Sequence, residues 1–194
     1  MRIDITYPLG EKDFKALAAL APRDKALSQI DLFGHVGTHL DLMGKSYPDD
    51  CYATSGRLFD VRNVSGRDIG IGDVDLPAVR EREFVIFHTG CLASFAYGSK
   101  AYVFAPIQLS WGLIHALAAK KVALIGVDLA GVRLPGEHPK ADEFCAGQGV
   151  FIVENLYNLQ ALADAAGNGT FTAHTYPLRL EGATGLPCRI IAEA

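Results

Sequence analysis

The sequence lacks a long hydrophobic run: no stretch approaches the roughly 20 consecutive apolar residues that a membrane-spanning helix needs. Its first residues, Met1-Arg2-Ile3-Asp4, do not resemble a signal peptide. No basic run occurs and the formal net charge is -4, so we expect neither a nucleic-acid partner nor a membrane partner. The cysteines are scattered without a C-x-x-C pair, which argues against a thiolate zinc site and indicates reduced thiols in the cytoplasm; they are Cys51, Cys91, Cys145 and Cys188.

What the sequence does contain is typical of one globular domain. Its 194 residues are enough to bury a core without disulfides or structural metals, and we expect a single domain over residues 1–194. Hydrophobic residues make up 49% of the chain and charged residues 21%, as in ordinary globular proteins. No repeat, low-complexity tract or linker divides the chain.

β-Prone and helical segments predict a mixed α/β fold with strands at both ends of the chain. Two strand–helix–strand passages are expected in the second half, where apolar runs are typical of strands buried on both faces. The expected strands cover 3–7, 57–62, 83–90, 122–128, 149–154, 173–180 and 188–192, and the expected helices cover 13–20, 110–119 (with Ser110 as N-cap) and 139–146.

The most informative stretch is His35-Val36-Gly37-Thr38-His39-Leu40-Asp41. Imidazole and carboxylate ligands suit Zn²⁺ or Mn²⁺, and three protein ligands leave room for a reactive water. Gly37 favours extended or turning backbone here, although both a helix and a strand would bring His35, His39 and Asp41 close together. The stretch therefore predicts a metal site, and the alternative is a chance grouping of polar residues near a strand end.

Two further groups of polar residues are candidates for the same site. Glu154 follows a buried apolar strand, where an unpaired charge is costly, so we expect a metal ligand or general base unless the side chain reaches water. The segment 133–143 contains His138 and Asp142, and it forms either a solvated loop leading into a helix or a source of functional side chains.

A last group, His88-Thr89-Gly90-Cys91, ends an expected strand, and strand ends are common site positions in α/β sheets. Thr89 is a candidate for binding substrate or orienting a ligand. Cys91 is a candidate nucleophile, which would make the protein a thiol enzyme. No G-x-S-x-G sequence supports serine-hydrolase chemistry.

The order of these motifs resembles that of a known family. H-x-G-T-H-x-D at 35–41 looks like the motif of the cyclase family, which includes bacterial kynurenine formamidases and isatin hydrolases. Four other segments are similar to family elements in the same order, so the resemblance covers most of the chain; they are the strand at 3–9, Thr89-Gly90, the strand ending in Gly-x-Asp at 126–128, and Glu154-Asn155-Leu156.

The resemblance implies an α/β fold of the swivelling β/β/α type with a mixed sheet, in a homodimer or homotetramer. It also implies a Zn²⁺ or Mn²⁺ site that hydrolyses an amide or related acyl bond of a small molecule. By motif position, His35, His39 and Asp41 would be metal ligands, and Glu154 would be a further or bridging ligand.

The sequence departs from the formamidases of this family at three points. Lys45 stands where their first motif continues to a histidine, and the early tryptophan is missing, since the only tryptophan is Trp111. The family also carries a histidine in the window before its glutamate. Here Asp142 replaces that ligand, or the preceding loop brings His138 into the site.

Two function classes follow from these residues. In the first, the protein is a metal-dependent hydrolase, in which Glu154 completes the metal shell or accepts a proton from water, and Lys45 stabilises the oxyanion or protonates the leaving group unless it is a surface residue. In the second, the chain is a degenerate family member that binds a metal or a small ligand without hydrolysis.

Overall fold

The computed structural model describes residues 1–13, 15, 33–167 and 169–194. The helix expected over 13–20 falls largely outside the described residues. The strands are β1 (Arg2–Asp4), β2 (His39–Asp41), β3 (Ala53–Asp60), β4 (Phe84–His88), β5 (Leu124–Val127), β6 (Phe151–Glu154), β7 (Thr170–Pro177) and β8 (Gly185–Glu193). The helices are α3 (Cys91–Ser94), α4 (Lys100–Val103), α5 (Trp111–Ala119), α6 (His138–Gly147) and α7 (Leu159–Ala166), and the short 3-10 turns are η1 (Asp49–Cys51), η2 (Ile71–Asp73) and η3 (Leu76–Ala78).

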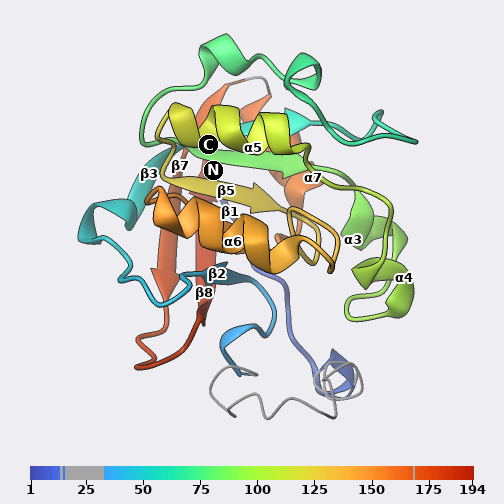
Figure 1. Cartoon of the computed structure of the whole chain (residues 1–194), viewed down its shortest axis with the longest axis vertical. Coiled ribbons are helices and arrows are strands. Elements are labelled where there is room, and N and C mark those ends of the chain that lie inside the picture. The colour runs from blue at the N-terminus through green and yellow to red at the C-terminus, as the bar shows by residue number, and fades with distance from the viewer. Residues whose placement is uncertain (14, 16–32, 168) are drawn as a thin grey trace.

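The strands form one mixed sheet in the order β1-β8-β2-β6-β5-β4-β3-β7. β3, β4, β5 and β6 are parallel to their neighbours in this series, whereas β2 pairs antiparallel with both β6 and β8. Because β8 also pairs with β7, seven of the strands close into a ring. β1 lies outside this ring and pairs antiparallel with the last residues of β8. The two chain ends therefore lie side by side, as Figure 1 shows.

Alternating side chains divide the core into two layers on either side of this sheet. One layer fills the interior of the ring and includes Phe84, Leu124 and Val153. The other lies outside, where Val85 and Ile152 pack with the apolar faces of α5 and α6. Figure 1 shows these two helices running alongside β5, one on each side of it in this view. Strands buried on both faces explain why the central segments read as continuous apolar runs.

The sequence-based expectations match the central elements and differ at their ends. Both strand–helix–strand passages are present, as β4–α5–β5 and β5–α6–β6, and Ser110 caps α5 by accepting a hydrogen bond from the Leu113 amide at 3.2 Å. The final pair of strands is present, but β7 starts and ends three residues earlier than the expected 173–180, and β8 begins before the expected 188. β7 ends at Pro177 because proline has no amide hydrogen to continue the ladder.

Two other findings bear on the expectations from composition. All four cysteines are buried free thiols. Among the described residues, no helix has both the length and the apolarity that crossing a membrane requires.

The interior layer is packed tightly at Gly126 of β5. A Cβ atom built there would lie 2.6 Å from both Leu156 Cδ1 and Phe84 Cε2, and both of these side chains are fully buried. We expect Gly126→Ala to lower the free energy of unfolding by about 1–3 kcal/mol, because overpacking forces neighbours from their rotamers. Urea unfolding measures the change.

Gly72 of η2 provides the matched control, since no heavy atom lies within 4 Å of a Cβ built there. Gly72→Ala should change the free energy of unfolding by no more than about 0.5 kcal/mol. Equal effects of the two substitutions would show that the interior layer is not closely packed around Gly126.

Candidate metal centre

Two neighbouring strands present three of the candidate ligands on one face of the sheet. In the antiparallel pair of β2 and β6, His39 lies directly opposite Glu154. Residues directly opposite share a face, and Asp41, two positions after His39, points the same way. Leu40 and Val153 occupy the alternate positions and belong to the interior layer. The pairing therefore places the polar side chains outside the ring, on the side that α6 covers.

Helix α6 supplies two more candidates, His138 and Asp142, which lie one turn apart. His138 Nε2 lies 3.0 Å from Asp142 Oδ2 and 2.9 Å from Glu154 Oε1. The carboxylate of Asp142 and the imidazole of His138 therefore both reach the cluster. The segment 133–137 is a partly exposed loop that leads into α6, and His138 and Asp142 lie on the first turns of that helix.

His35 reaches the cluster from the turn before β2. Its Nδ1 lies 3.1 Å from Asp41 Oδ1 and 3.2 Å from His39 Nε2. His39 Nε2 in turn lies 3.5 Å from both Asp41 Oδ1 and Glu154 Oε2. His35 and His138 are half-buried and the other members are buried, so the cluster has a solvent-facing side at these two histidines.

Some carboxylate oxygens of this cluster lack a hydrogen-bond partner, and such oxygens indicate whether a cation fits the site. Asp41 Oδ2 and Asp142 Oδ1 are buried and have no hydrogen-bond partner within the described part of the chain. Glu154 Oε1 lies close to His138 but without the alignment of a hydrogen bond. Buried oxygens with free lone pairs are costly unless something pairs with them.

The side chains form two overlapping sets in which the ligand atoms all lie within 4.8 Å of one another; the sets are His35–His39–Asp41 and Asp41–His138–Asp142–Glu154. Asp41 belongs to both. Nitrogen and carboxylate oxygen donors at this density fit a divalent cation in either set.

The charges within the cluster shift its pKa values strongly. Glu154 is the main reason that the pKa of His138 rises to about 12, against the opposing effect of burial. Burial lowers the pKa of His39, but Asp41 and Glu154 outweigh it and raise the pKa to about 9. Burial raises the pKa of Asp142 to about 7. Without a cation, the imidazoles of His39 and His138 therefore hold protons at neutral pH, and binding a cation would release them.

Hydrogen bonds outside the cluster orient its histidines. His39 Nδ1 lies 2.9 Å from the carbonyl oxygen of Gly37, and this bond leaves Nε2 facing the carboxylates. His35 Nε2 lies 3.0 Å from Thr184 Oγ1. The sequence gives no signal for Thr184, because the contact depends on the pairing of β2 with β8. Thr38 is turned away from the histidines and donates to the carbonyl oxygen of Asn155 at 2.8 Å.

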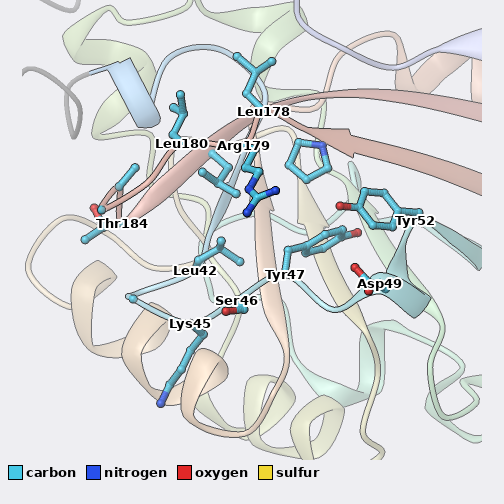
Figure 2. Close-up of a pocket in the computed structure, with 15 residues that line it drawn as sticks. Leu42, Lys45, Ser46, Tyr47, Asp49, Tyr52, Leu178, Arg179, Leu180 and Thr184 are labelled. Carbon is cyan, nitrogen blue, oxygen red and sulfur yellow. The ribbon is translucent and has the colours of Figure 1, made fainter.

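Lys45 is exposed, on the connection between β2 and η1. It lines a cavity of about 630 Å³ between this connection and the β7–β8 connection, together with Tyr47, Arg179 and Thr184. Figure 2 shows the Lys45 side chain pointing away from Arg179 and Tyr47. The cavity adjoins the histidine cluster at Thr184, so a role for Lys45 in chemistry requires a different orientation of its side chain.

The residues at the end of β4 are held by a separate set of bonds. Asp128 Oδ1 accepts hydrogen bonds from the amide and the hydroxyl of Thr89, at 2.8 and 2.7 Å, and Oδ2 accepts one from the Gly90 amide. Asp128 thus stabilises the turn after β4 through these three hydrogen bonds. Cys91 is 1% exposed and burial raises its pKa to about 12, which opposes a thiolate nucleophile.

Residues 3–132 match the sequence model of the family described as "Putative cyclase". The chain belongs to the cyclase family. No match was found among curated proteins.

Several solved structures share the fold of this cyclase-family chain. One, named as a potential metal-dependent hydrolase with cyclase activity, has a TM-score of 0.73 at 22% identity, with 99% of this chain and 96% of that chain covered. A predicted metal-dependent hydrolase from Bacillus stearothermophilus has a TM-score of 0.73 at 23% identity, covering 99% and 97%. Isatin hydrolase A from Labrenzia aggregata has a TM-score of 0.73 at 15% identity, covering 99% and 93%.

In the metal-free protein, the raised pKa of His39 makes stability depend on pH. The folded pKa is about 9 and the ordinary value is 6.5. The stability that protonated His39 contributes is therefore fully present below about pH 6.5 and is lost as the pH rises through about 9. We expect the urea midpoint of chelator-treated protein to fall across this interval. His39→Gln should show a shallower fall, and equal slopes would contradict the assignment.

Proposed function

We propose that this cyclase-family protein is a metal-dependent hydrolase that cleaves an amide, formamide or cyclic amide or ester bond of a small molecule. The observation that carries the proposal is the cluster on β2, β6 and α6, in which Asp41 and Asp142 each keep a buried oxygen without a partner. The names of the structural neighbours support a hydrolase, and the bond that is cleaved is inferred from the family resemblance.

The two overlapping sets divide the roles of the ligands. His35, His39 and Asp41 would hold one divalent ion, and Asp41, His138, Asp142 and Glu154 have the donors for a second. Zn²⁺ or Mn²⁺ suits the mixture of imidazole and carboxylate. A bound ion of this kind polarises the carbonyl of the scissile bond and lowers the pKa of a water from about 15.7 to about 7.

The residues of the chain then orient the reactants and move protons. Glu154 is buried between His39 and His138, at 3.5 and 2.9 Å, so it either completes the ligand set or accepts a proton from the attacking water. Lys45 would protonate the leaving group or stabilise the oxyanion after its side chain turns toward the cluster. We further propose that the substrate is an aryl formamide or a similar compound. We also propose that the protein acts in the cytoplasm as a homodimer or homotetramer.

Metal content is the first test. Protein purified without chelators should contain about one or two equivalents of Zn or Mn per chain, in keeping with the two ligand sets. His39→Ala should lose the ion of the first set, because one of that set's three ligands is removed. Elemental analysis measures both. A wild-type protein that holds no metal and cannot be reloaded with Zn²⁺ or Mn²⁺ would exclude the hydrolase mechanism.

Hydrolysis by the metal-loaded protein is the second test, with N-formyl aromatic amines, cyclic imides and lactones as probes. We expect turnover to fall by about 100-fold or more in Lys45→Ala, since general acid catalysis contributes about 10²–10⁴-fold, while the metal content stays unchanged. Lys100→Ala is the control, because Lys100 is an exposed lysine on α4. Unchanged turnover in Lys45→Ala would remove its role, and bound metal without any hydrolysis would favour the ligand-binding alternative.

A further inference from the structure

Asn155 occupies an unusual position directly after Glu154. Its φ is 57°, in the left-handed region that asparagine tolerates better than most residues, and its side chain is buried. The backbone turns sharply here at the end of β6, so that the backbone N–H of Asn155 donates to the carbonyl oxygen of Leu129 at 3.0 Å. This turn brings the side chain back toward the motif that contains the histidines.

The side chain of Asn155 joins two distant segments. Its Nδ2 donates to the carbonyl oxygen of Gly37 at 3.0 Å, and its Oδ1 accepts a hydrogen bond from the hydroxyl of Tyr102 at 2.6 Å. The Gly37 carbonyl oxygen, which can only accept, decides which way the side-chain amide faces, and the Tyr102 hydroxyl holds the amide oxygen in that orientation. If the amide were reversed, its oxygen would meet the Gly37 carbonyl oxygen, and two acceptors would lie in contact.

The carbonyl oxygen of Gly37 is also the acceptor for Nδ1 of His39, at 2.9 Å. The orientation of the His39 ring, and hence of its Nε2, depends on where this carbonyl points. The Gly37 amide is held as well, because it donates to the Tyr97 hydroxyl at 2.8 Å. Since Gly37 has a φ of 65° and no side chain, these bonds rather than local sterics fix its peptide groups.

We propose that Asn155 and Tyr102 are positioning residues, which fix the Gly37 carbonyl and so hold His39 Nε2 toward Asp41 and Glu154. Neither residue contacts the substrate or the metal in this role. The inference rests on the proposed metal-binding function. The contacts run from Tyr102 on α4 through Asn155 at the end of β6 and the Gly37 carbonyl to the candidate ligand His39. Bonds of this kind around a ligand histidine change metal affinity by about 10- to 100-fold.

The decisive variant is Asn155→Gly. Glycine adopts the left-handed φ without strain, so the backbone turn is kept while the amide is removed. We expect its dissociation constant for Zn²⁺, measured by competition with a chelator of known affinity, to rise by about 10- to 100-fold. Wild-type affinity in Asn155→Gly would overturn the proposal.

The chain contains a matched control in Asn158, which has the same φ of 57° but an exposed side chain on the same β6–α7 connection. Its side chain makes a long bond of 3.4 Å to the carbonyl oxygen of Asp4, away from the cluster. Asn158→Gly changes the flexibility of the unfolded chain in the same way as Asn155→Gly. It should leave the affinity for Zn²⁺ unchanged, and an equal loss in both variants would assign the effect to flexibility and overturn the proposal.

A second variant, Tyr102→Phe, keeps the buried ring and removes the hydroxyl that donates to the side-chain oxygen of Asn155. It should also weaken Zn²⁺ binding, by less than Asn155→Gly, because the amide remains but is no longer held. In Zn²⁺-loaded protein, NMR of ¹⁵N-labelled histidine should show a slowly exchanging Nδ1 proton on His39. This exchange should become faster in both variants, whereas a purely structural role would lower the melting temperature and leave the exchange as in wild type.

The outcomes also separate this inference from the proposed function. If wild-type protein binds neither Zn²⁺ nor Mn²⁺, the proposed function fails before the variants are compared. If wild type binds Zn²⁺ and Asn155→Gly and Tyr102→Phe bind it equally well, the metal site stands and the positioning role of these two residues is wrong.

Discussion

The burial of Asp41, Asp142 and Glu154 against one another is the interaction on which the rest of the site depends. Like charges in a low-dielectric environment repel, and burial alone favours their protonated forms. Here the imidazoles of His39 and His138 offset the charge, and their raised pKa values measure that attraction. Protons on the histidines leave oxygens of Asp41 and Asp142 without partners, however. These carboxylates would hold a divalent cation, whose positive charge would replace that of the protons and whose coordination would pair the free oxygens of Asp41 and Asp142.

The closed sheet is what keeps such a cluster from relaxing into solvent. β2 is only three residues long, yet it is buried along its whole length and paired on both edges, with β6 and with β8. The β7–β8 pairing completes the ring. Because β2 is hydrogen-bonded to a strand on each side, it is not an edge strand that could separate from the sheet. α6 then covers the outer face and adds two side chains at one-turn spacing. Functional groups mounted on paired strands and a helix are held more precisely than groups on loops.

Local pattern predicted which residues belong to the cluster, and long-range pairing decided how they meet. The apolar run before Glu154 was enough to predict a strand that ends in a carboxylate, whereas the spacing of His35, His39 and Asp41 is compatible with both a helix and a strand. The register of β2 and β6, with His39 opposite Glu154, follows from a pairing between segments far apart in the chain, which periodicity does not encode. For the same reason, the contact of His35 with Thr184 and the bond from Asn155 to Gly37 were not predicted. Lys45 was selected by its place in the family motif, and motif position carries no information about where a flexible side chain points.

The departure of α6 from the family pattern has a consequence for the kind of ion that each ligand set prefers. His138 and Asp142 share a helix face, so an imidazole still reaches the cluster although a carboxylate occupies the position expected for the family's histidine. The set that includes them therefore has one nitrogen donor and three carboxylates, whereas the set around His35 has two nitrogens and one carboxylate. Nitrogen-rich sets suit Zn²⁺, and carboxylate-rich sets suit harder ions such as Mn²⁺. Asp41 belongs to both sets, so an ion bound in one lowers the negative charge that is available to the other, and the two positions should fill with unequal affinity.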